Sequence, residues 1–375
     1  MNRGIDERRM ADLCERAPSY VRGIAPYQPG KPVSELAREM GLEESSIIKL
    51  ASNENPLGPS AAAVAAMRKA LDDAARYPDG NAFELKAALS VKFGVGPNQL
   101  VLGNGSNDVL ELAARAFLAP GRSAVYSQYA FAVYPLAVQA SGATAIEVPA
   151  REFGHDLAAM AAAIRGDTRL VFVANPNNPT GTWHAPEPML AFLRRVPANV
   201  LVVLDEAYFE YLDPQLRGNA IDWIGEFPNL LVTRTFSKAY GLAAMRVGYG
   251  IASAPVAELI NRVRQPFNVN SVAQAGAVAA LADEDFVAAG RSLNRQGMDS
   301  LTRGFERLGL SWIPSQANFV SVRVGRGMEV FQGLLKRGVI VRPTGGYAMP
   351  EYLRVTIGTV AENQRFLETL EAVLK

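Results

Sequence analysis

The stretch Val200-Leu201-Val202-Val203-Leu204-Asp205-Glu206-Ala207-Tyr208 decides the fold class of this chain. Its apolar run is continuous, whereas a strand with one exposed face would alternate apolar and polar residues. It therefore predicts a strand that is buried on both faces, as in a parallel sheet covered by helices. Asp205 ends the run, so its carboxylate is expected at the carboxyl end of the strand, where open α/β sheets bind their ligands.

Similar apolar runs occur before and after this strand, and stretches with helical spacing separate them. The runs cover residues 100–102, 124–126, 145–148, 170–173, 230–233 and 247–251. Alternation of short strands with helices is typical of α/β proteins. We therefore predict a large domain with a mainly parallel seven-stranded sheet covered by helices.

The pattern changes after Pro266, which indicates a second domain. One long helical stretch is expected at about 272–308, followed by strand-like segments at 319–324, 339–342 and 353–357. With 375 residues the chain is long enough for two domains. We expect an N-terminal arm and helix at 1–48 that packs with the small domain, a large ligand-binding domain at 49–268 and a smaller α+β domain at 269–375.

Composition excludes several classes of function. Lys plus Arg (38) nearly balances Asp plus Glu (37), so no basic surface for nucleic acid or an anionic membrane is expected. We find no apolar run long enough to cross a membrane, and Asp6 and Glu7 interrupt the first ten residues, so we expect a cytoplasmic protein. One cysteine, Cys14, and two histidines, His155 and His184, predict neither a disulfide nor a metal site.

Lys238 is the first candidate for chemistry. The stretch Thr235-Phe236-Ser237-Lys238 follows a predicted strand, and Arg246 follows eight residues later. Two hydroxyls, an amine and a guanidinium at the end of a strand could hold a phosphate ester beside a reactive amine. A lysine in such a loop is more often only a solvated charge, so other features must decide between the two interpretations.

Three further loops add groups at the same edge of the predicted sheet. Gly105, Ser106 and Asn107 lie between a strand and a helix, where backbone N–H groups can bind a phosphate. Asn178 follows the strand at 170–173, although Asn178-Pro179-Thr180-Gly181 is also an ordinary turn composition. Tyr208 comes three residues after Asp205. Together these loops offer the amine, the carboxylate, the donors and the anion pocket that pyridoxal 5'-phosphate needs.

The ordered set of motifs resembles the fold-type I pyridoxal-phosphate aminotransferases and, among them, the histidinol-phosphate aminotransferases. The resemblance covers nearly the whole chain. It is carried by Tyr20-Val21-Arg22-Gly23-Ile24, Ser52-Asn53-Glu54-Asn55-Pro56-Leu57-Gly58, Arg76-Tyr77-Pro78-Asp79-Gly80, Asn178-Pro179-Thr180-Gly181, Asp205-Glu206-Ala207-Tyr208, Thr235-Phe236-Ser237-Lys238 and Tyr352-Leu353-Arg354-Val355.

The resemblance implies a role for each matching residue. Lys238 would hold the cofactor as an imine and move protons, Asp205 would pair with the ring nitrogen, and Asn178 and Tyr208 would donate to the ring oxygen. The residues expected around the cofactor phosphate are Gly105, Ser106, Asn107, Thr235, Ser237 and Arg246. Tyr77 would reach the cofactor phosphate of a neighbouring subunit, which implies a homodimer with shared active sites.

The expected substrate contacts are Arg354, Arg342, Tyr27 and Asn53. Arg354 would grip an anionic group, but a guanidinium suits a carboxylate and a phosphate equally and does not decide the substrate. One stretch departs from the family pattern: Tyr126-Ser127-Gln128-Tyr129-Ala130-Phe131 replaces the expected proline and threonine. We predict that Tyr129 stacks on the cofactor ring, with Phe131 as the alternative.

The resemblance implies a transaminase that converts histidinol phosphate and 2-oxoglutarate to imidazole acetol phosphate and glutamate, a step of histidine biosynthesis. Three alternatives remain open at this stage. The first is an aromatic amino-acid aminotransferase acting on phenylalanine or tyrosine. The second is a decarboxylase of a phosphorylated amino acid, which would release carbon dioxide. The third is a regulator that binds pyridoxal phosphate without catalysis.

Overall fold

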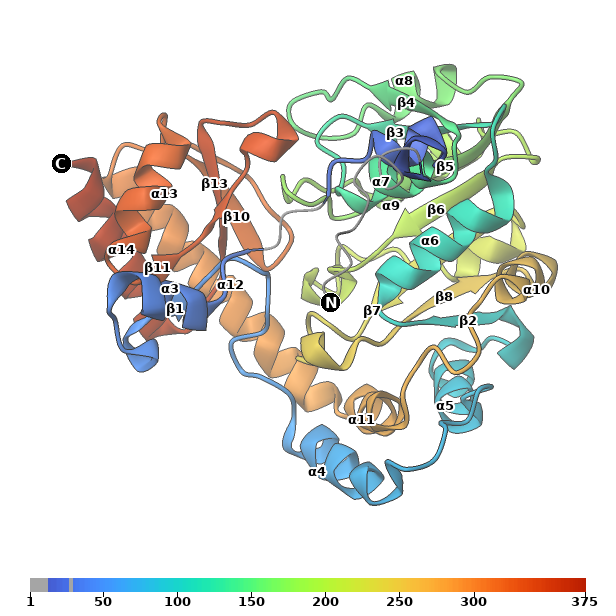
Figure 1. The fold of residues 1–375 in the computed structure, drawn as a ribbon, viewed down its shortest axis with the longest axis horizontal. Helices are drawn as coiled ribbons and strands as arrows, with labels where there is room; N and C mark the ends of the chain where they lie inside the picture. Colours follow the sequence, from blue (N-terminus) through green and yellow to red (C-terminus); the bar gives the residue numbers. More distant parts are fainter. Residues whose placement is uncertain (1–12, 27–29) are drawn as a thin grey trace, which may run out of the picture.

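The computed structural model describes residues 13–26 and 30–375 of the chain, which form a large and a small domain (Figure 1). A seven-stranded sheet is the centre of the large domain, with the strand order β2-β8-β7-β6-β5-β3-β4. The strands are β2 (Leu100–Gly103), β3 (Ser123–Ser127), β4 (Thr144–Val148), β5 (Thr168–Ala174), β6 (Leu201–Asp205), β7 (Leu230–Thr235) and β8 (Gly248–Ala252). All seven coincide with the predicted apolar runs.

Neighbouring strands from β7 through β6, β5 and β3 to β4 pair in parallel, whereas β8 is antiparallel to both β7 and β2. The prediction of a mainly parallel sheet is therefore confirmed. Because β5, β6 and β7 point the same way, the residues that follow them meet at one edge of the sheet.

Helices cover both faces of this sheet. One face carries α6 (Ser106–Phe117), α7 (Val133–Ala140) and α10 (Ala254–Arg262), and the other carries α4 (Ala61–Ala70), α5 (Phe83–Phe93), α8 (Leu157–Ala162), α9 (Pro186–Leu193) and α11 (Ser271–Ala282). Because both faces of the sheet are covered, the sequence of strand β6 is continuously apolar. Leu201 and Val203 pack into the hydrophobic core on the face covered by α6, α7 and α10, while Val202 and Leu204 pack into the core on the opposite face.

The small domain has an antiparallel sheet with the strand order β12-β13-β10-β9. Its strands are β9 (Trp312–Ile313), β10 (Phe319–Arg323), β12 (Arg342–Pro343) and β13 (Tyr352–Thr356), and its helices are α12 (Glu284–Arg307), α13 (Gly327–Leu335) and α14 (Val360–Leu374). The single segment expected at 339–342 is divided in two. Its first half, β11 (Val339–Ile340), pairs instead with β1 (Ile48–Lys49).

The long helix expected at 272–308 is also divided, which corrects the prediction. Helix α11 ends at Ala282 and α12 begins at Glu284, where the Asp283 carboxylate accepts a hydrogen bond from the backbone N–H of Phe286. A side-chain cap of this kind starts a new helix. Helix α11 packs on α4 in the core of the large domain, and α12 leads into the small domain (Figure 1). The boundary at 268/269 stays a prediction, and the packing of α11 with the large domain favours a later one.

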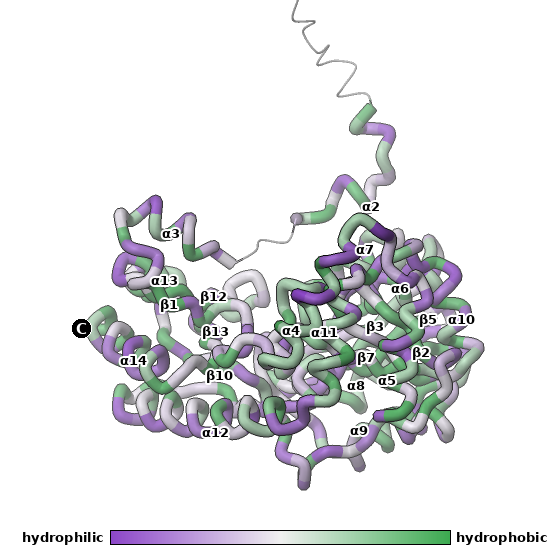
Figure 2. The backbone as a smooth tube through the Cα atoms, turned by 90° about the horizontal axis from the view of Figure 1, so that it is seen from below, coloured by the Kyte–Doolittle hydropathy of each residue, from purple (hydrophilic) through white to green (hydrophobic). Residues whose placement is uncertain are grey.

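The N-terminal region contacts both domains. Helix α2 (Ser19–Arg22) lies against α7, while α3 (Val33–Met40) packs beside β1 and α13 (Figure 2). The short 3₁₀ turns of the chain are η1 (Glu44–Ser46), η2 (Leu71–Asp73), η3 (Pro97–Gln99), η4 (Phe209–Tyr211), η5 (Asp222–Gly225), η6 (Ala243–Met245) and η7 (Gly345–Tyr347). No helix in residues 13–26 or 30–375 is both long and apolar enough to span a membrane.

Candidate active site

A cavity of about 250 Å³ lies at the carboxyl ends of β5, β6 and β7, beneath residues of the small domain. It brings together residues from separate loops, as the sequence predicted. The predicted site residues in its lining are Asn53, Ser106, Asn107, Asn178, Asp205, Tyr208, Thr235, Ser237, Lys238, Arg246, Arg342 and Arg354. Tyr27 lies outside the described residues.

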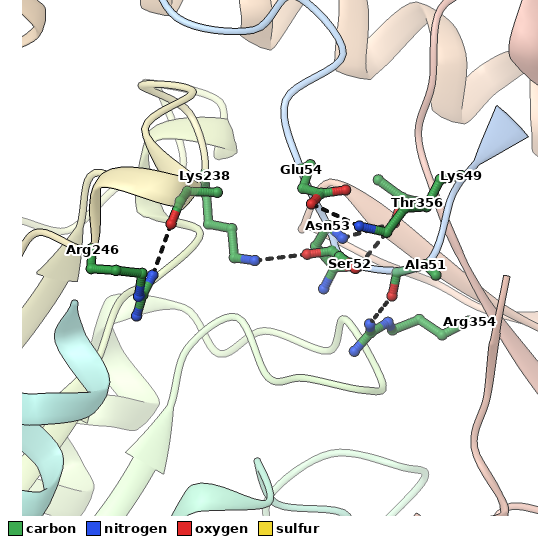
Figure 3. Close-up of polar contacts among 10 residues, drawn as sticks. Lys49, Ala51, Ser52, Asn53, Glu54, Lys238, Arg246, Arg354 and Thr356 are labelled. Atoms are coloured by element: carbon green, nitrogen blue, oxygen red, sulfur yellow. Dashed lines mark hydrogen bonds and ion pairs between the residues drawn. The ribbon is translucent and has the colours of Figure 1, made fainter. Parts of the chain in front are cut away.

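Lys238 lies in the loop after β7 and points into this cavity (Figure 3). Its Nζ donates a hydrogen bond to the backbone carbonyl of Ser52 at 3.0 Å. Burial is the main cause that lowers the pKa of this amine to about 7, and the nearby positive charge of Arg354 acts in the same direction. The amine is therefore largely neutral just above pH 7, which is the form that attacks a carbonyl group.

Asp205 ends β6 with its carboxylate buried below the cavity. Oδ2 accepts a hydrogen bond from the Tyr134 hydroxyl at 2.8 Å, and Oδ1 accepts one from the Thr233 hydroxyl at 3.0 Å. Burial raises the pKa of this carboxyl, while those two hydrogen bonds oppose the shift. No cationic side chain of the described residues pairs with the Asp205 carboxylate. A positively charged ring N–H in the cavity would therefore supply the missing cationic partner.

Tyr134 and Thr233 were not identified from the sequence. Thr233 is opposite Asp205 in the parallel register of β6 and β7, so a register prediction could have found it. Tyr134 comes from α7 and stacks on Phe172 with ring centroids 4.7 Å apart. Its position depends on how α7 packs on the sheet, and no local motif indicates that.

An anion pocket forms where α6 begins. Ser106 is the first residue of this helix, and the Arg246 guanidinium donates to the Ser237 hydroxyl at 3.2 Å and to the Asn104 carbonyl at 3.4 Å. Gly105 does not line the cavity, but a Cβ there would collide with the Arg246 guanidinium. Glycine thus lets the arginine approach the helix N-terminus, and a helix N-terminus beside a guanidinium suits a phosphate group.

Asn53 and Asn178 connect the large domain to the small one, through Thr356 and Arg354 respectively. The Asn53 side-chain amide donates to the Tyr208 hydroxyl at 2.9 Å, while Arg354 of β13 donates to the Asn178 side-chain carbonyl and to the Ala51 carbonyl. Burial raises the pKa of Tyr208 to about 12, so the phenol stays neutral and can donate a hydrogen bond.

The two aromatic candidates, Tyr129 and Phe131, lie in different surroundings. Phe131 lines the cavity and meets Tyr134 edge-on, with ring centroids 5.9 Å apart. The Tyr129 ring packs instead on Phe153 at 5.7 Å, and its residue has a left-handed φ of 58°. Tyr129 is not among the residues that line the cavity, which no pattern of residue types predicted.

Tyr77 is not part of the cavity of its own chain. Its side chain is 83% exposed and stacks on Phe267 with ring centroids 4.9 Å apart. His155 is buried and His184 is half-buried beside it near the loop after β5, with ring centroids 6.1 Å apart. No cluster of three or more possible metal ligands occurs in the described residues.

Comparison with known proteins identifies close relatives. The model of the aminotransferase class I and II family matches residues 45–370. A histidinol-phosphate aminotransferase of Methylobacillus flagellatus is 64% identical over 366 residues, which are 98% of this chain and 99% of that protein. Histidinol-phosphate aminotransferase 2 of Nitrosospira multiformis is 60% identical over 97% of this chain and 93% of that protein.

A solved structure has the same fold. The histidinol-phosphate aminotransferase of Sinorhizobium meliloti, crystallised in complex with pyridoxal-5'-phosphate, superposes with a TM-score of 0.88 at 29% identity. The match covers 96% of this chain and 97% of that one.

Proposed function

Because this chain belongs to the family of class I and II aminotransferases, we propose that it is a pyridoxal-phosphate-dependent transaminase that moves the amino group of histidinol phosphate to 2-oxoglutarate. The substrate assignment is supported by relatives of about 60% identity over nearly the full length. The single structural observation that carries the chemistry is the convergence of Lys238, Asp205 and the Ser106–Arg246 anion pocket on one cavity.

The residues present fit this cofactor. Asp205 is a buried carboxylate without a cationic partner in the described chain, and the start of α6 with Ser237 and Arg246 offers a phosphate pocket. Asn178 and Tyr208 would hold the ring oxygen, and Phe131 would cover the ring face. When bound, the cofactor supplies an electron sink for the negative charge that develops at the substrate α-carbon.

The side chains of this chain perform the proton transfers and the positioning. Lys238, with its pKa of about 7, can take the α-proton of the substrate and return a proton near neutral pH. Arg354 holds the anionic end of the substrate and joins the two domains through Asn178 and Ala51. The burial of Asp205 and Tyr208 keeps water away from both groups, which strengthens their interactions.

A donor screen with the purified holoenzyme tests this function. With 2-oxoglutarate as acceptor, kcat/KM for histidinol phosphate is expected to exceed that for phenylalanine or tyrosine by about 100-fold, because the site then uses both the phosphate and the imidazole. Glutamate and the oxo product are measured together with carbon dioxide. A preference for phenylalanine would make the chain an aromatic aminotransferase, and carbon dioxide release would make it a decarboxylase.

Attachment of the cofactor is expected to depend on pH through Lys238. Only the neutral amine attacks a carbonyl, so the rate at which the apoprotein binds pyridoxal phosphate covalently should rise about tenfold per unit below pH 6 and level off above about pH 8. The change in visible absorbance after mixing measures this rate. A rate that still rises steeply toward pH 10 would show that the lysine pKa is not lowered.

Variants at positions 129 and 131 test the aromatic assignment. Phe131→Ala is expected to weaken cofactor binding about 5- to 10-fold, because the ring contact contributes about 1 kcal/mol or somewhat more. Tyr129→Ala is the matched control and should change the cofactor Kd less than twofold. Equilibrium dialysis measures both values, and the reverse order would restore Tyr129 as the stacking residue.

We also propose a homodimer in which Tyr77 reaches the cofactor phosphate of the partner subunit. The proposal is supported by the Tyr77 phenol, which is exposed and does not line the cavity of its own chain. Tyr77→Phe should raise the cofactor Kd about 5- to 20-fold through the lost hydrogen bond to an anion, with the mass measured by light scattering unchanged. A monomeric wild type would contradict this arrangement.

A cytoplasmic location stays a prediction, which fractionation of cells would test.

A further inference from the structure

Residues 51–54 form a segment that crosses the cavity and is held at three points (Figure 3). The Ala51 carbonyl accepts from Arg354 at 2.7 Å, and the Ser52 carbonyl accepts from Lys238 at 3.0 Å. The backbone N–H of Asn53 donates to the Thr356 hydroxyl at 2.9 Å. The segment therefore passes from the anion-binding arginine to the reactive amine and then to Glu54.

Glu54 stands out by its charge. Among the described residues that line the cavity, the acidic side chains are Asp205 and Glu54, against the cationic groups Lys238, Arg246, Arg342 and Arg354. Asp205 is buried and already accepts hydrogen bonds from Tyr134 and Thr233. Glu54 is partly exposed, and its hydrogen-bond partner among the described residues is Lys49, which donates to Oε1 at 3.0 Å. Oε2 can therefore accept a hydrogen bond from a molecule in the cavity.

A substrate that suits this order of groups has an anion at one end, an amine in the middle and a hydrogen-bond donor at the other end. Histidinol phosphate has this order, because its amine-bearing carbon lies between the phosphate and the imidazole ring. We propose that Glu54 is a specificity-determining residue whose carboxylate accepts a hydrogen bond from the imidazole N–H. The inference rests on the proposed function, since it names the partner of one end of that substrate.

A carboxylate can select an imidazole against a phenyl ring of similar size for a physical reason. The imidazole offers an N–H donor and can carry a positive charge, and hydrogen bonds between ionised partners are about twice as strong as neutral ones. A phenyl ring in the same place would leave the Glu54 carboxylate without that partner, which costs binding free energy. A purely structural role in the ion pair with Lys49 is the competing explanation.

Two matched pairs of ligands test the inference with the holoenzyme. Imidazolylpropyl phosphate and phenylpropyl phosphate lack the amine, so their Kd values report binding without turnover and can be measured by calorimetry. Histidinol phosphate and phenylalaninol phosphate are the corresponding amino donors. In Glu54→Gln we expect the preference for imidazole over phenyl to fall about tenfold in both Kd and kcat/KM, with the phenyl ligands changed less than twofold.

Lys49→Met is the control, because it breaks the same ion pair and keeps the carboxylate. It should retain the wild-type preference for imidazole. The inference is overturned if Glu54→Gln weakens both rings equally, if it changes neither, or if Lys49→Met causes the same selective loss. Failure of the wild type to use histidinol phosphate at all is a different result, since it would refute the proposed function before any variant is measured.

Discussion

Lys238→Ala is expected to abolish transamination, with kcat lowered by about 10⁴-fold or more. In the proposed function this variant lacks both the amine that would attach the cofactor and the group that would move the proton, and general acid–base catalysis alone contributes up to about 10⁴-fold. The visible absorbance of the covalently attached cofactor should disappear as well. Both quantities are measured on purified protein incubated with excess pyridoxal phosphate.

Lys86→Ala is the matched control for this variant. Lys86 is another half-buried lysine whose pKa is lowered by burial, but it does not line the catalytic cavity. It should retain near-wild-type kcat and the visible absorbance. Turnover that persists in Lys238→Ala, with an unchanged melting temperature, would remove this lysine from the mechanism.

Asp205→Asn is expected to lower kcat at least about 100-fold while cofactor binding persists with reduced affinity. The amide keeps the size of the side chain but removes the negative charge that would hold a proton on the cofactor ring nitrogen. Preorganised charge opposite a developing charge is commonly the largest single contribution to catalysis. Single-turnover rates and cofactor Kd values separate the two effects.

Tyr134→Phe provides a graded comparison. It removes the hydroxyl that donates to Asp205 Oδ2 but leaves the carboxylate charged. We expect a loss of about 5- to 10-fold, which corresponds to about 1 kcal/mol, because Thr233 still donates to the carboxylate. If Asp205→Asn were no slower than Tyr134→Phe, the charge of Asp205 would not contribute to the rate.

The sequence was informative about the large domain because each signal is local. A continuous apolar run can be recognised as a doubly covered strand without knowing its neighbours, and all seven strands were placed in this way. The sequence did not predict the break between α11 and α12 or the division of segment 339–342 into β11 and β12. The cap at Asp283 and the pairing of β11 with β1 depend on one residue or on segments far apart in the chain.

The two aromatic candidates also differ in their tertiary contacts and not in any local sequence signal. Tyr129 and Phe131 are both aromatic and lie two residues apart, so residue type could not distinguish them. The left-handed backbone at Tyr129 and the contact of Phe131 with Tyr134 distinguish them in the folded chain. Tyr134 itself is a tertiary neighbour of Asp205, 71 residues away along the chain.

The amino-acid sequence alone determined the chemical groups of this protein: a lysine, a carboxylate and phosphate-binding loops, each placed at the end of a buried strand. Parallel strands made those separate loops meet, because their carboxyl ends share one edge of a sheet. Tertiary structure decided what surrounds each group. Burial lowers the pKa of Lys238, tyrosine and threonine hydroxyls donate to Asp205, and residues 51–54 bind both Lys238 and the small domain. Desolvation and long-range contacts of this kind have no signature in a local stretch of sequence.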